Sequence, residues 1–166
     1  MRKHGFSHVG LATLDMDATK DFYEGVLGFE TVRYDRFGIS EGGQVRHLFM
    51  DIGDGQLISF MEPTGVNGIP ATFDAGINGG LGVPNSFYHV AFEADSVENL
   101  ERVRERLDSR GVKVTPVMDH DWCRSIYFFD PDGILLEFAA WTRELREGDV
   151  AHAPVNKYGI ASTTAN

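Results

Sequence analysis

The chain has 166 residues, of which 42% are hydrophobic, and this is enough for one globular domain with a substantial core. Its formal net charge of −10 argues against a nucleic-acid-binding surface and against a patch for anionic membranes. No apolar run reaches about 18 residues, and the N-terminus lacks the long apolar region of a signal peptide. The single cysteine, Cys123, excludes an intramolecular disulfide framework and leads us to expect a cytoplasmic protein.

The first half of the chain predicts one strand, one helix and three further strands. Residues 6–15 alternate in the manner of a strand, and apolar residues then recur every four positions through 16–27. Asp15 or Asp17 can cap the start of this helix, and Gly28 can end it. The three strands that follow are expected at 29–35, 44–53 and 56–62, the last two joined by the hairpin signal "GDG".

The second half repeats this order. A strand-like run at 86–95 precedes a helix whose apolar stripe is Val97, Leu100, Val103 and Leu107. Asp95 or Ser96 can cap that helix, and Gly111 can end it. Strands are then expected at 112–118, 124–130 and 133–140, the last two joined by "DPDG".

A repeated order of this kind predicts two tandem modules within one α+β domain. We expect two βαβββ modules that form a cupped mixed sheet around a metal site. The boundaries are 1–141 for the domain, with module one at 5–62, a Gly- and Pro-rich connector at 63–85, module two at 86–141, and a C-terminal tail at 142–166.

Two histidines occupy equivalent places in the two modules, because His8 and His89 each lie in the opening strand. Glu137 lies within the apolar run "GILLEFAA", where a carboxylate is costly unless a positive group neutralises it. Two imidazoles and one carboxylate form the facial arrangement that suits Fe(II) or Mn(II). Aligning "DGILLE" with "DGQLIS" places Ser59 opposite Glu137, and Glu62 falls on the other pleat face, so three protein ligands are expected.

The segments "HVGLATLDMDATKDFYEGVLGFE", "YHVAFEADSVENLERVRERLDSRGVKV" and "SIYFFDPDGILLEF" resemble the vicinal oxygen chelate superfamily over residues 5–141. This superfamily includes glyoxalase I, fosfomycin-resistance proteins, bleomycin-binding proteins and extradiol dioxygenases. The resemblance implies metal ligation by His8, His89 and Glu137, and it implies a homodimer.

Within the superfamily, the chain looks most like the ring-cleaving dioxygenases. The glyoxalase I pattern has a fourth ligand where this chain has Ser59, and Tyr127 stands ten residues before Glu137, at the spacing of an extradiol tyrosine that binds a substrate oxygen. The stretch "DHDWCRSIYF" resembles hydroquinone-cleaving members, which place a basic residue at the position of His120. Tyr127 and His120 are therefore the predicted catalytic residues. Gln56 departs from the pattern, because catechol-cleaving relatives have an acid–base histidine in that region; His120 or His47 is a possible substitute.

The resemblance implies a dioxygenase that uses O₂ on a small aromatic or phenolic substrate, a catechol or hydroquinone. Fe(II) is the preferred metal, and Mn, Zn, Ni and Co stay open. Two alternatives remain. One is a lyase, isomerase or transferase of glyoxalase or fosfomycin type that uses the metal as a Lewis acid, and the other is a non-catalytic protein that binds a small ligand. No nucleic acid and no membrane is expected as a partner.

Overall fold

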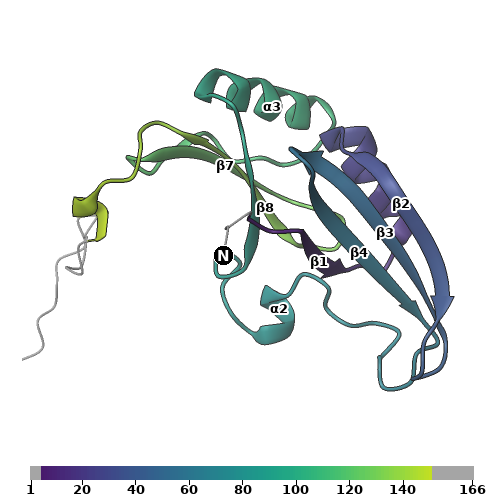
Figure 1. Cartoon of the computed structure of the whole chain (residues 1–166). Helices are drawn as coiled ribbons and strands as arrows, with labels where there is room; N and C mark the ends of the chain where they lie inside the picture. Colours follow the sequence, from purple (N-terminus) through teal and green to yellow (C-terminus); the bar gives the residue numbers. More distant parts are fainter. Residues whose placement is uncertain (1–4, 151–166) are drawn as a thin grey trace, which may run out of the picture.

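The computed structural model describes residues 5–150 and contains two four-stranded sheets, one from each half of the chain (Figure 1). We call them sheet A, with strand order β1-β4-β3-β2, and sheet B, with strand order β5-β8-β7-β6. The elements of the first half are β1 (His8–Ala12), α1 (Met16–Lys20), η1 (Asp21–Leu27), β2 (Glu30–Gly38), β3 (Gln44–Gly53) and β4 (Gln56–Thr64). Those that follow are α2 (Asn78–Leu81), β5 (His89–Glu93), α3 (Val97–Ser109), β6 (Met118–Asp119), β7 (Cys123–Phe129), β8 (Leu135–Trp141) and η2 (Glu147–Val150).

Strand pairing is the same in both halves and confirms the predicted α+β fold of two tandem βαβββ modules. In each module the first strand pairs in parallel with the last, and the remaining pairs are antiparallel. Each module forms its own four-stranded sheet.

The helix predicted at 16–27 is present, but its second part is wider than an α-helix. It begins as α1 and continues as the π-helical η1. The Asp15 side chain accepts hydrogen bonds from the backbone amides of Asp17 and Ala18 at its start. Gly28 ends it with a φ of 84°, a left-handed conformation that glycine adopts without a steric penalty. No helix within residues 5–150 is long and apolar enough to cross a membrane.

The strand predicted at 112–118 is mostly absent. Only the two-residue β6 pairs with β7, together with one isolated bridge between Val114 and Phe128. Pro116 lies between these two contacts and has no amide hydrogen to give to a ladder. The alternation of apolar residues therefore predicted correctly that the segment is extended. The prediction that all of it pairs in the sheet was wrong.

One hydrophobic core joins the two modules. Its buried members come from both sheets and from the helices, and include Tyr23, Leu48, Phe60, Leu100, Phe128 and Leu136. The Tyr23 hydroxyl of η1 donates a hydrogen bond of 3.1 Å to Asp130 in the turn between β7 and β8. In the same turn Asp132 accepts a hydrogen bond of 3.0 Å from the backbone amide of Leu14. The "DPDG" turn of module two is thus docked on module one.

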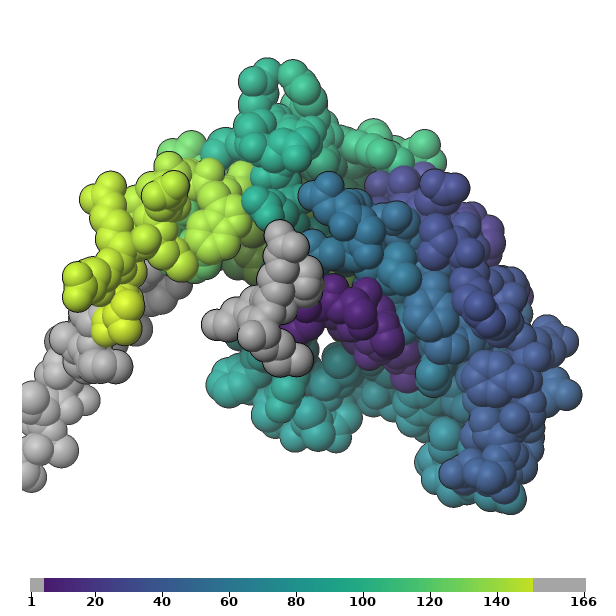
Figure 2. All heavy atoms as spheres, in the orientation of Figure 1, coloured from purple at the N-terminus to yellow at the C-terminus, as the bar shows by residue number. Residues whose placement is uncertain are grey.

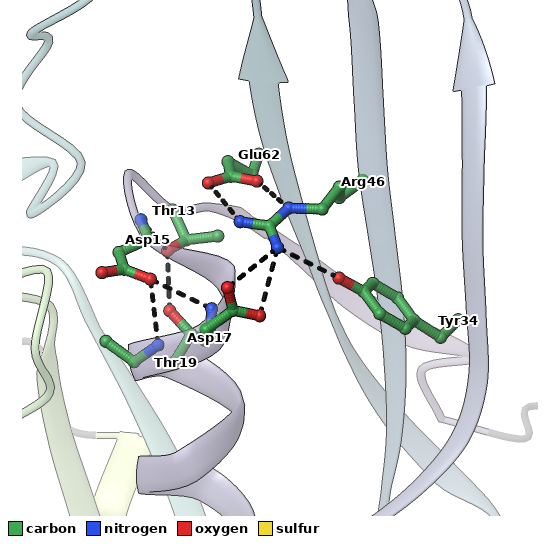
Figure 3. A network of polar contacts seen from close by, with 8 residues as sticks. Thr13, Asp15, Asp17, Thr19, Tyr34, Arg46 and Glu62 are labelled. Atoms are coloured by element: carbon green, nitrogen blue, oxygen red, sulfur yellow. Dashed lines mark hydrogen bonds and ion pairs between the residues drawn. The ribbon is translucent and has the colours of Figure 1, made fainter.

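Arg46 on β3 links the first turn of α1 to sheet A (Figure 3). Its guanidinium donates two hydrogen bonds to the Glu62 carboxylate and two of 3.1 Å to Asp17, and it lies 3.5 Å from the Tyr34 hydroxyl. These carboxylates raise the pKa of Arg46 above its usual value. The Glu62 carboxylate is therefore engaged in an ion pair with Arg46. As the alternation of side chains along the strand predicted, Glu62 lies on the face of sheet A opposite to Ser59.

Each sheet turns one face towards the core and the other away from it; we call the latter its open face. By strand alternation and register, the open face of sheet A carries His8, His47 and Phe49, and that of sheet B carries His89, Tyr127 and Glu137. In space-filling view the molecule is an arch, with module one on one side and the segment after β8 on the other (Figure 2).

Candidate functional site

The centre of the candidate site is a contact between His89 and Glu137. His89 opens β5 and Glu137 lies in β8, its parallel neighbour. Nε2 of His89 is 3.1 Å from Oε2 of Glu137, whose exposed fraction is only 6%. The imidazole thus partners the carboxylate that the apolar run "GILLEFAA" buries.

Tyr127 completes this cluster from β7, where it is the cross-strand partner of Glu137. Its hydroxyl is 3.1 Å from Nε2 of His120, at hydrogen-bond distance. Burial raises the pKa of Tyr127 to about 12, and the nearby Glu137 carboxylate adds to that rise. The phenol therefore keeps its proton at neutral pH. The structure brings together four of the five predicted site residues, His89, Glu137, Tyr127 and His120.

The fifth predicted residue, His8, lies elsewhere. It is on β1 of sheet A, with Nδ1 3.0 Å from the Ser7 hydroxyl and the ring edge-on to Phe49 at 5.6 Å between centroids. Within residues 5–150, no three His, Cys, Asp or Glu side chains are placed together so as to hold a metal ion. One chain thus does not assemble the expected triad, because each module forms a separate sheet and His8 lies in a different sheet from His89 and Glu137. Metal ligation by the three residues stays a prediction.

His8 belongs to a second cluster, on the open face of sheet A. The His47 ring is 4.3 Å from that of Phe49 and 6.2 Å from that of Phe37, between centroids. Nε2 of His47 is buried with no hydrogen-bond partner in the described part of the chain, and burial lowers the pKa of this histidine. The imidazole is therefore neutral at neutral pH and lies on an aromatic surface. The alternation of β3 predicts that His47 and Phe49 share a face, but the contribution of Phe37 depends on the pairing of β2.

Ser59 and Gln56 behave as structural or lining residues. The Ser59 hydroxyl is buried and donates to the Val9 backbone carbonyl, 3.5 Å away on the neighbouring strand. Gln56 and His89 both line a cavity of about 260 Å³ at the junction of the modules. His89 also lines a second junction cavity of about 290 Å³, together with Phe87 and other largely apolar residues. The candidate site therefore borders space large enough for a small ligand.

Two polar residues near this site were not singled out from the sequence. Asp121 follows His120, and Arg143 follows the end of β8; the two side chains form an ion pair of 2.7 Å. No spacing or periodicity links a residue in one turn to a residue 22 positions later, so only the fold reveals this contact.

A family model for the Glyoxalase/Bleomycin resistance protein/Dioxygenase superfamily matches residues 5–138. The chain belongs to this superfamily. The match spans both modules and includes every predicted site residue.

Solved structures with the same fold come from proteins with different roles. A glyoxylase/bleomycin resistance protein/dioxygenase domain from Frankia sp. EAN1pec has a TM-score of 0.64 at 22% identity, covering 89% of this chain and 96% of that one. TnmS3, an antibiotic binding protein from Streptomyces sp. CB03234, has a TM-score of 0.60 at 20% identity and coverages of 86% and 99%. A mutant of FosX, a fosfomycin resistance protein from Listeria monocytogenes, was solved with Mn(II) and 1S,2S-dihydroxypropylphosphonic acid; its TM-score is 0.56 at 25% identity, with coverages of 83% and 93%.

Proposed function

We propose that this chain is a divalent-metal-dependent enzyme in which His89 and Glu137 are two of the metal ligands. The observation that carries the proposal is the contact of 3.1 Å between Nε2 of His89 and Oε2 of a buried Glu137. Imidazole nitrogen and carboxylate oxygen form a donor set that suits Fe(II), Mn(II) and Zn(II). When bound, a divalent cation would neutralise Glu137 and act as a Lewis acid on substrate oxygens.

We further propose that a second copy of the chain supplies His8. The donor set of one chain fits a metal only in part, because it provides two ligands on sheet B and the third on sheet A. His8 is exposed on its open face, where a neighbouring chain can reach it. Placing the open face of sheet A of one copy against that of sheet B of the other would unite His8 with His89 and Glu137 at each of two equivalent sites. This arrangement accounts for the expected homodimer.

The reaction we propose is extradiol-type ring cleavage of a catechol- or hydroquinone-like substrate, with Fe(II) as the metal. Support comes from Tyr127, whose protonated hydroxyl can donate to an anionic substrate oxygen near Glu137. Nε2 of His120 is within reach of that hydroxyl and can exchange a proton with it. The aromatic surface of Phe37, His47 and Phe49 would face this cluster from the second copy and suits a planar ring.

A second candidate is Lewis-acid chemistry of the glyoxalase or fosfomycin-resistance type. It is favoured by FosX, which is 25% identical to this chain and was solved with Mn(II). A third candidate, non-catalytic ligand binding, is favoured by the fold shared with the antibiotic binding protein TnmS3. The His89–Glu137 contact argues for the metal-dependent alternatives, because a purely apolar ligand site does not need a buried carboxylate.

The test is anaerobic metal analysis of the full chain, followed by oxygen uptake on a panel of catechols and hydroquinones after Fe(II) loading. About one iron per chain with uptake and a ring-cleavage product supports the dioxygenase. Bound metal without uptake on any panel member supports the Lewis-acid alternative. Absence of metal from both the purified and the reloaded chain would contradict the proposal and leave ligand binding.

A further inference from the structure

The segment after β8 leaves the body of the molecule but stays tied to one turn of module two. We call residues 142–150 the arm; it runs outward from sheet B and ends in η2 (Figure 1). Its first residue, Thr142, bonds through its amide to the Trp122 carbonyl at 3.0 Å and through its hydroxyl to the Asp121 carbonyl at 2.9 Å. The arm therefore begins with contacts to the turn that connects β6 to β7. We call this turn, residues 120–122, the Asp121 turn.

Arg143 strengthens this tie with a charge. One of its guanidinium nitrogens donates to Asp121 at 2.7 Å, and the guanidinium also donates two hydrogen bonds to Asp149, of 2.8 and 2.9 Å. Bidentate contacts of this kind fix the orientation of the arginine fork. Asp149 thus holds Arg143 in the position from which it contacts Asp121.

The turn that Arg143 contacts has an unfavourable backbone. Asp121 has a φ of 75°, in the left-handed region that residues with a side chain adopt uncommonly. Its amide bonds to the Asp119 side chain at 2.8 Å, and the amide of His120 bonds to the Cys123 carbonyl at 2.9 Å. Such strain persists where surrounding contacts support it, and it is common at functional sites.

The strained turn carries His120, the partner of Tyr127. Nε2 of His120 is 3.1 Å from the Tyr127 hydroxyl, and Tyr127 lies across the strand pair from Glu137. A continuous set of contacts therefore leads from Asp149 through Arg143 to the Asp121 turn, and from His120 to Tyr127.

We propose that Arg143 is a positioning residue, which holds the Asp121 turn in the conformation that presents His120 to Tyr127. The effect of Arg143 on the contact between His120 and Tyr127 does not depend on the reaction, whereas its consequence for turnover rests on the function proposed above. A role limited to overall stability fits poorly, because the Asp121 side chain is 74% exposed and exposed ion pairs contribute little to folding. The arm would thereby hold His120 in contact with Tyr127 without itself touching substrate.

The experiment compares four full-length variants with the wild type. Arg143→Ala removes the guanidinium, and Arg143→Lys keeps the positive charge without the bidentate geometry. Asp121→Asn removes the negative charge and keeps a side chain that tolerates the left-handed region. Arg102→Ala is the matched control, because Arg102 is an exposed arginine in a 2.9 Å ion pair with Glu98 on α3. The first readout is the nuclear Overhauser effect between the ring protons of His120 and Tyr127, with His120→Gln used for assignment.

We expect the ring–ring signal to be lost or strongly reduced in Arg143→Ala and Asp121→Asn, partly restored in Arg143→Lys, and unchanged in Arg102→Ala. Mn(II) binding should equal that of the wild type in all of them, while turnover of the Fe(II)-loaded enzyme falls about 10-fold in the first two. An unchanged signal in Arg143→Ala and Asp121→Asn would overturn the proposal. Failure of the wild type to bind Mn(II) would instead count against the proposed function and leave the ring–ring readout intact. Should Arg143→Ala not fold, Asp121→Asn decides the question.

Discussion

The Tyr23 hydroxyl of module one donates a hydrogen bond of 3.1 Å to the Asp130 carboxylate of module two, and both residues are buried. Asp130 also accepts hydrogen bonds from the amides of Asp132 and Ile134 within its own turn. Burial nevertheless raises the pKa of Asp130 to about 6, and the charge of Asp132 acts in the same direction. The contact that docks the second module on the first therefore contains a titrating group.

This pKa makes stability depend on pH in a definite direction. Because the folded-state value lies above the usual value for an aspartate, about 3.9, the folded chain binds the proton more tightly than the unfolded chain. The resulting stabilisation is complete below about pH 4 and is lost as the pH rises to about 6. We expect the Asp130 contribution to lower the free energy of unfolding by about 2–3 kcal/mol across this window, with little further change above it.

Chemical denaturation of the wild type and of Asp130→Asn at a series of pH values measures this contribution. The asparagine variant should lose the decline between pH 4 and 6 that Asp130 causes, because its amide does not titrate. Tyr23→Phe is the companion variant: it removes the donor to the carboxylate and should destabilise the protein at pH 7 by about 1–2 kcal/mol. An identical pH dependence in wild type and Asp130→Asn would contradict the assignment.

Glu62 is predicted to act in folding and not in metal binding. Arg46 and Glu62 have exposed side-chain fractions of 20% and 12%, so removing one charge leaves the other partly buried. Glu62→Gln should lower the free energy of unfolding by about 1–2 kcal/mol, and metal stoichiometry should not change. Calorimetry and metal analysis on the same samples check both statements. Loss of metal at unchanged stability would place Glu62 in the site.

The local elements were predictable from the sequence because local chemistry determines them. β3 occupies residues 44–53 as predicted, since its alternation ends at a hairpin in which Asp54 and Gly55 both have positive φ. The cap by Asp15 and the stop at Gly28 follow in the same way from side-chain and backbone preferences. The pairing of 112–118 could not be read from alternation, because Pro116 removes a donor that only matters once a neighbour strand is in place.

The site was predictable only within one module. Register places Tyr127 beside Glu137, and the parallel pairing of β5 with β8 brings His89 to them. His8 has the same position in its own module, but long-range packing, which the local sequence does not specify, decides which open faces come together. Repeat symmetry gives equivalent positions and does not specify the chain that contributes each one.

Tyr127 is predicted to act in turnover and not in metal binding. Tyr127→Phe removes the hydroxyl that lies 3.1 Å from His120 and keeps the aromatic ring on the open face of sheet B. Metal content should remain at the wild-type level, while turnover of a phenolic substrate should fall about 100-fold. Steady-state oxygen uptake with parallel metal analysis is the measurement, and Phe129→Tyr on the same strand is a control for added or lost hydroxyl groups. Unchanged turnover would make Tyr127 a packing residue.

The origin of His8 can be tested by mixing two inactive variants. His8→Ala and Glu137→Ala should each bind substantially less metal when pure, because each lacks one proposed ligand at every site. If His8 comes from a second copy, a mixed dimer has one site with both substitutions and one site with none. Unfolding and refolding the two variants together in equal amounts should then restore about a quarter of the wild-type metal content, since about half of the dimers are mixed and half of their sites are intact.

The same mixture gives a different result if one chain supplies all three ligands. Every chain then carries a defect in its own triad, so the mixture should bind no more metal than the separate variants. Mixing His89→Ala with Glu137→Ala is the matched control, because these ligands share sheet B and no combination of chains restores an intact pair. Recovery in the first mixture and none in the control would assign His8 to the partner copy. Equal recovery in both, or in neither, would reject the two-chain site.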